Sequence, residues 1–168
     1  MQPGNVIHVR TDKDVDFVLG IAQNTADTAN LVPPAALGAD GACRSVLKSI
    51  SILSDQQLAW NLQLYSRNTF VAGQADLDAE FFLGQWSFIE ADGTQVAAGG
   101  PFQYYIDGLD IPYFCGDFDT HATFVAGAKR PQGQIHLQLV NRSSTSKNAG
   151  ATGEIVIDLG FVPTDGRS

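Results

Sequence analysis

Cysteine and positive charge are both scarce in this chain. Only Cys43 and Cys115 are present, which are too few for a disulfide framework, so we expect two reduced thiols. Ten basic residues stand against 18 acidic ones, giving a net charge of -8. Because nucleic acid and anionic membrane surfaces repel such a chain, we expect neither as a partner.

Long apolar runs are missing as well. No segment approaches the roughly 20 apolar residues of a membrane-spanning helix, and residues 1–5 lack the basic start and apolar core of a signal peptide. We therefore expect the protein to stay in the cytoplasm where it is made, unless it leaves as part of a larger particle. A hydrophobic content of 44% lets this chain bury roughly 70% of its unfolded surface, which predicts one domain over residues 1–168.

The segment 134–163 carries the clearest structural pattern. Ile135, Leu137 and Leu139 alternate with polar residues, and the same period of two returns at residues 155–161 after a loop of small and polar residues. Period two indicates strands with one buried face. Together with the turn-forming residues between other short apolar runs, it predicts an all-β fold, a single antiparallel β-sandwich of jelly-roll type.

The remaining strands are expected from the same pattern. Two hairpins are predicted, one joining 44–53 to 58–65 and one joining 81–90 to 94–98 across the Asp92-Gly93 turn. The stretch 23–43 contains two adjacent prolines, so we expect a long irregular loop there. Outside the hairpins, we expect strands at 6–9, 15–21 and 123–126 and short edge strands at 102–106 and 111–114. We also expect one helical turn at 75–79.

Alternation also predicts which side chains form the core. The expected core residues are Leu58, Trp60, Leu62, Leu64, Trp86, Phe88, Ile135, Leu137, Leu139, Ile155, Ile157 and Leu159.

Two acidic clusters have the spacing of metal ligands on an extended segment. They are Cys115, Asp117, Asp119 and His121, and Asp76, Asp78 and Glu80. A bend at Gly116 interrupts the first cluster, and no calcium-binding loop pattern follows the second. An acidic loop with a buried thiol and a solvated loop are the favoured interpretations, so we expect no metal and no cofactor.

No local motif of a catalytic site is present. The chain lacks a nucleophile elbow, a phosphate loop and a dinucleotide fingerprint, although an unrecognised small hydrolase stays open as an alternative. His8, His121 and His136 stand alone in the sequence. His136 is expected on the outward face of its strand, as a solvent or interface residue.

Aromatic residues beside carboxylates support an alternative function, glycan binding. Tyr104, Tyr105, Asp107 and Tyr113 combine the rings and the carboxylate that sugar sites use. Filling of the sandwich core is the competing interpretation of the same rings.

The closing block supports a resemblance. Residues 135–142, the Ser/Ala/Gly loop, residues 153–157 and Val162-Pro163 resemble the last strands of small virion proteins of tailed bacteriophages, especially jelly-roll decoration (cement) proteins. The resemblance implies a non-enzymatic protein on the outer capsid surface, often a homotrimer, that bridges neighbouring copies of the major capsid protein. It carries over no catalytic residue.

Two segments suit contacts with such a capsid. They are an N-terminal arm at about residues 1–10 and the irregular loop at about 23–43. Within and beside them, Gln2, Arg10, Asn30 and Arg44 are the candidate partner-binding residues, with Arg10 and Arg44 as ion-pair donors to acidic capsid groups.

Overall fold

The computed structural model shows an almost entirely β protein. It describes residues 6–17, 21–31, 44–65, 82–114, 135–144 and 154–163. The strands are β1 (Ile7–Arg10), β2 (Ala26–Leu31), β3 (Arg44–Ser54), β4 (Trp60–Tyr65), β5 (Phe82–Phe88), β6 (Thr94–Gln95), β7 (Phe102–Ile106), β8 (Ile111–Phe114), β9 (Ile135–Asn141) and β10 (Ile155–Pro163). The predicted all-β class is confirmed.

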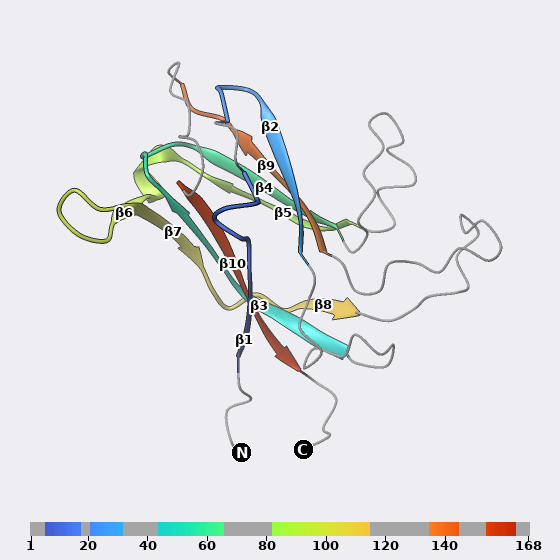
Figure 1. Ribbon diagram of the computed structural model, residues 1–168. Coiled ribbons are helices and arrows are strands. Elements are labelled where there is room, and N and C mark those ends of the chain that lie inside the picture. Colours follow the sequence, from blue (N-terminus) through green and yellow to red (C-terminus); the bar gives the residue numbers. More distant parts are fainter. Residues whose placement is uncertain are drawn as a thin grey trace.

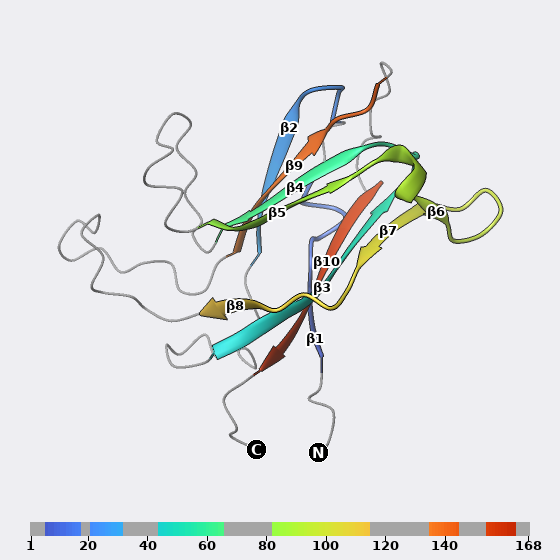
Figure 2. The same ribbon diagram turned by 180° about the vertical axis from the view of Figure 1, so that it is seen from behind.

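The strands form two antiparallel sheets. One has the order β1-β10-β3-β7-β6, with β8 pairing the other half of β3, and the second has the order β2-β9-β4-β5. Figures 1 and 2 show the two sheets as separate layers, with β2, β9, β4 and β5 together in one of them. Side chains from the inner faces of both layers join one core, which is the arrangement of a β-sandwich.

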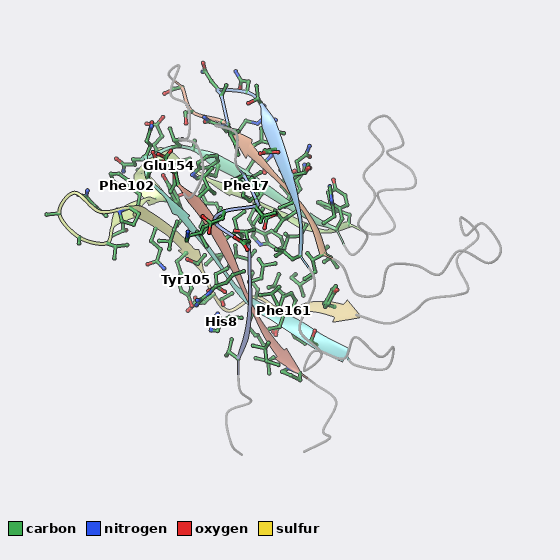
Figure 3. All side chains as sticks on the ribbon, in the orientation of Figure 1. His8, Phe17, Phe102, Tyr105, Glu154 and Phe161 are labelled. Atoms are coloured by element: carbon green, nitrogen blue, oxygen red, sulfur yellow. The ribbon has the colours of Figure 1, made fainter. Side chains whose placement is uncertain are left out.

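The predicted core is nearly all confirmed. Eleven of the twelve expected side chains are buried, whereas Trp86 is half-buried and packs against the others. Tyr104, Tyr113 and Phe161 add large rings to the same core, and so does Phe17, which lies in a turn (Figure 3). The alternation therefore identified the inner faces correctly.

The two predicted hairpins are wrong, because in each of them the two strands enter different sheets. Strand β3 lies in the six-stranded sheet and β4 in the four-stranded one, and the same separation holds for β5 and β6 and for β9 and β10. In a hairpin the two apolar faces lie side by side, whereas here they face each other across the core. Both arrangements bury the same alternate residues, so alternation cannot distinguish between them.

The Asp92-Gly93 sequence forms no type I′ turn. Residues Glu90–Asp92 are a short 3-10 helix, Asp92 Oδ2 accepts a hydrogen bond from the Ile89 amide at 2.8 Å, and Gly93 has a φ of -73°. Gly93 is needed for space instead, since a Cβ there would lie 2.7 Å from the Tyr104 ring. That ring is held by its hydroxyl, which accepts a hydrogen bond from the Leu58 amide at 2.7 Å.

The N-terminal region also differs from expectation. The predicted strand at 15–21 is wrong in its described part, where Asp12 and Asp14 begin a turn and Val15 is 69% exposed. Strand β2 lies instead within 23–43, which was expected to be irregular. It is an edge strand, in agreement with the expectation that this stretch is not central. Residues 32–43, 75–79 and 123–126 lie outside the described part.

A buried polar network anchors the end of β9. The Asn141 side chain donates to the Ile21 carbonyl at 2.9 Å and accepts from the Ser143 amide at 3.0 Å. The Ser143 hydroxyl accepts from the Ala59 amide at 3.0 Å, just before β4. Because each of these buried groups has a partner, the network fixes three chain segments together without an unsatisfied amide.

Candidate functional site

The outer face of the four-stranded sheet is a regular array of uncharged side chains. Strand pairing places its outward positions in three rows that each cross all four strands. We call this surface the amide face, and its rows are Ala26, Val140, Asn61 and Ser87; Thr28, Gln138, Gln63 and Gln85; and Asn30, His136, Tyr65 and Phe82. None of these positions holds Asp, Glu, Lys or Arg, although the chain contains 28 such residues, the sum of 18 acidic and 10 basic ones.

Hydrogen bonds between neighbouring strands organise the amide face. Gln63 Nε2 donates to Gln85 Oε1 at 2.8 Å, and the Tyr65 hydroxyl donates to Gln63 Oε1 at 3.2 Å. In the neighbouring row, the Ser87 hydroxyl donates to Asn61 Oδ1 at 3.4 Å. These contacts orient the side chains before any partner arrives, which lowers the conformational entropy lost on binding.

Aromatic rings occupy one end of the amide face. The Tyr65 and Phe82 ring centroids lie 5.4 Å apart at an interplanar angle of 53°, and Tyr65 lies 6.2 Å from the His136 ring. Phe82 is 44% exposed. His136 is on the outward side as predicted, but it is only 5% exposed, so of the two expected alternatives, a solvent or an interface residue, the first is wrong. Tyr65 on the adjacent strand packs against it.

The outer face of the six-stranded sheet has a different chemistry. Pairing places Arg10, Asp158, Ser51 and Tyr105 in one row. Asp158 accepts from Arg10 Nε at 2.5 Å and contacts His8 Nδ1 at 2.9 Å, while Lys48 pairs with Asp110 nearby. His8 and Tyr105 lie on this side of the molecule (Figure 3). We call this surface the ion-pair face.

Of the four predicted partner-binding residues, the three that the structure describes lie on three different strands. Arg10 lies on β1, where its guanidinium is bound to Asp158, and Arg44 begins β3 opposite Phe114. Asn30 lies on the other sheet, in β2, where its backbone pairs with His136. Gln2 is outside the described residues.

Of the four residues expected to bind a glycan, two are buried in the core and two are exposed at the surface. Tyr104 and Tyr113 are 0% and 1% exposed and point into the core, so neither offers a ring face to a sugar. Burial raises the pKa of the Tyr104 hydroxyl. Tyr105, 57% exposed, and the exposed Asp107 are the two members that reach the surface.

A pair of carboxyl groups lies where β3 ends and β10 begins. The Asp55 amide donates to the Glu154 carbonyl at 3.0 Å, and the two side chains share a hydrogen bond. Desolvation, followed by the charge of Asp55 and the shared hydrogen bond, raises the pKa of Glu154. The described residues contain no group of three or more potential metal ligands. The two acidic clusters for which we expect no metal, and both cysteines, lie outside them.

Sequence reasoning missed the amide face, although its signal was present. Asn61, Gln63 and Tyr65 alternate with the core residues of one predicted strand, and Gln85 and Ser87 do the same in another. Their lack of charge becomes meaningful only when the strands are placed in order.

A scan against models of protein families and a search of curated proteins found no match for this chain. In the described part, no helix has the length and apolar character to cross a bilayer.

Proposed function

We propose that this protein is a non-enzymatic decoration protein of a bacteriophage capsid, and that it docks onto the major capsid protein through the amide face. The carrying observation is the absence of formal charge from three complete rows of a sheet in a chain of net charge -8. The resemblance of residues 135–163 to closing strands of decoration proteins supplies the nature of the partner.

The chemistry of the amide face supports a docking role. Moving a charged group out of water costs much more than moving an amide that keeps a hydrogen-bond partner. Gln63 and Gln85 already share one hydrogen bond, so a partner that covers them has to supply acceptors only for their remaining N–H groups. Phe82 adds exposed apolar area at one end, where burial stabilises a complex.

Binding of this kind stabilises a particle by mass action. A protein that binds only the assembled lattice shifts the equilibrium between intact and broken capsids toward the intact form. No chemistry at a single residue is required, and contacts distributed over a sheet face are sufficient.

Co-sedimentation with undecorated capsids, built from the major capsid protein of the same virus, tests this proposal. We expect the wild type to bind and Gln138→Glu to bind at least about tenfold more weakly, because it places a charge in the middle of the amide face. Gln103→Glu is the matched control, since the same change then lies on the exposed ion-pair face. A wild type that does not bind, or equal loss in both variants, contradicts the proposal.

A second candidate function is binding of a neutral glycan to the same surface. The observation that favours it is the combination of amide side chains with the exposed Phe82 ring beside Tyr65. A glycan array distinguishes the two candidates. Binding to neutral oligosaccharides that Phe82→Ala abolishes supports the glycan, whereas an empty array together with capsid binding supports decoration.

A further inference from the structure

The edge strands of the two sheets are protected unequally. An edge strand exposes unpaired backbone N–H and C=O groups, and proteins usually prevent unwanted pairing there with short strands, charges or proline. Strand β1 has four residues and carries His8 and Arg10, β6 has two residues, and β8 contains Pro112. Strand β2 carries Asp27 on the inner face, opposite Leu139.

Strand β5 has none of these charges or prolines. Its sequence, FLGQWSF, is seven residues long, and within the described part of the chain it pairs only with β4. A bulge affects the end near Phe82, but the register is regular from Gly84 to Phe88. Strand β7 has a shorter free edge, since β6 covers it at Phe102 and Gln103. Among the strands that the structure describes, the longest edge strand is therefore also the one without charge.

We propose that the free edge of β5 pairs antiparallel with β5 of a second copy of this chain. A two-fold axis at Trp86 would join the two four-stranded sheets into one continuous eight-stranded sheet. Such a contact is isologous, because the same strand serves both sides. It is independent of the proposed docking onto a capsid.

The residues of β5 complement themselves in this register. On the outer face, Gln85 lies opposite Ser87 of the second copy, so a polar pair forms on each side of the axis. On the inner face, the two half-buried Trp86 side chains lie opposite each other at the axis. Each Trp86 ring already covers Gly84 of its own strand, where a Cβ would lie 2.6 Å from the ring, so the pairing places two apolar surfaces against each other.

Charge favours a second copy at this edge. Two chains of net charge -8 repel each other over most of their surfaces. The edge of β5 and the adjoining amide face carry no Asp, Glu, Lys or Arg, so two copies approach here with the least repulsion. The resulting pair is two-fold and differs from the trimer that the resemblance implies.

Sedimentation velocity over a wide range of protein concentration tests the pairing. We expect a reversible dimer in the wild type. The double substitution Gln85→Lys, Ser87→Lys places lysines opposite lysines of the second copy, and we expect it to raise the dimer dissociation constant at least about tenfold. Thr28→Lys is the control, because it introduces one lysine at an exposed position on the other edge of the same sheet.

Hydrogen exchange on the unmodified protein gives a second readout that does not depend on folding of a variant. We expect the amides of residues 84–88 to be more protected at high protein concentration than at low concentration. A wild type that is monomeric throughout, a trimer, equal disruption by Thr28→Lys, or protection at residues 84–88 that does not change with concentration overturns the proposal.

Discussion

The amide face and the ion-pair face occupy equivalent places on the two sheets and differ in their chemistry. The central row of the amide face joins Gln138, Gln63 and Gln85, whereas the equivalent row of the other sheet joins Arg10 to Asp158. Both faces are polar, so hydropathy alone does not distinguish them. Charge does, because an ion pair remains well solvated while a paired amide can be covered at low cost.

This difference shows that the distribution of charge is more informative than its total. A net charge of -8 describes the whole chain and suggests general repulsion of other acidic surfaces. In the part of the chain that the structure describes, the fold nevertheless keeps Asp, Glu, Lys and Arg off the outward positions of the four-stranded sheet. Four predictions test how far the contrast between the two faces extends.

The largest effects are expected on the inner faces, where the two sheets should be equivalent. Leu137→Ala in β9 and Ile157→Ala in β10 each remove a side chain that is 0% exposed, and each should lower the free energy of unfolding by about 2–5 kcal/mol. Denaturant unfolding measures both, with the exposed Val15→Ala as control. A small effect in one sheet alone would show that the core is not shared equally.

A smaller effect is expected from the same substitution on the two outer faces. Gln63→Glu removes the amide that donates to Gln85 Oε1 and places a charge on a half-buried position of the amide face, where Gln85 has to turn its own amide to donate to it, so it should lower the free energy of unfolding by about 1 kcal/mol. Gln103→Glu should cost less, because its partner, the Ser51 hydroxyl, can turn and donate to the new carboxylate. Unfolding of both variants at neutral pH measures the difference, and an equal cost would remove the contrast.

The ion pairs of the six-stranded sheet should contribute little to stability. Arg10 and His8 side chains are 63% and 50% exposed, so Asp158→Asn should lower the free energy of unfolding by no more than about 1 kcal/mol. The loss should shrink in high salt, which screens exposed charges. Unfolding curves at low and high ionic strength measure it, and a large loss independent of salt would contradict this view.

The smallest effect concerns pH and Glu154. Because the pKa of Glu154 is raised in the folded state, the stability that its protonated form contributes is present below its ordinary pKa of 4.5 and is lost as pH rises through the folded pKa. Glu154→Gln should therefore be more stable than the wild type at neutral pH, and this gain should vanish in acid. Thermal unfolding from acid to neutral pH measures it. If Glu154→Gln remains more stable than the wild type at low pH, the difference comes from packing and not from the charge of Glu154.

Local pattern predicted the strands well and their partners poorly. The alternation around Trp60 and around Leu137 identified buried side chains, because neighbouring residues of a strand always point to opposite faces. The same reasoning misjudged Gly93, for which an Asp-Gly turn was expected. There the decisive contact is with Tyr104 on β7, the strand that pairs with β6 directly after Gly93.

The candidate site was predicted less well than the fold. Residues chosen for their type, such as Tyr104 and Tyr113, are buried, and Arg10 is bound to Asp158 of its own chain. The amide face depends on residues from β2, β4, β5 and β9, which lie far apart in the sequence. No single segment of the chain is unusual enough to reveal it.

The sequence by itself determined that this protein is built of strands and which side of most strands faces inward. Those properties follow from a period of two, which is local and requires no knowledge of neighbours. Only the tertiary structure decided which sheet each strand enters, because a hairpin and a crossing between sheets bury the same alternate residues. The order of strands in turn decided that the uncharged positions form one continuous face and that β5 lies at its edge.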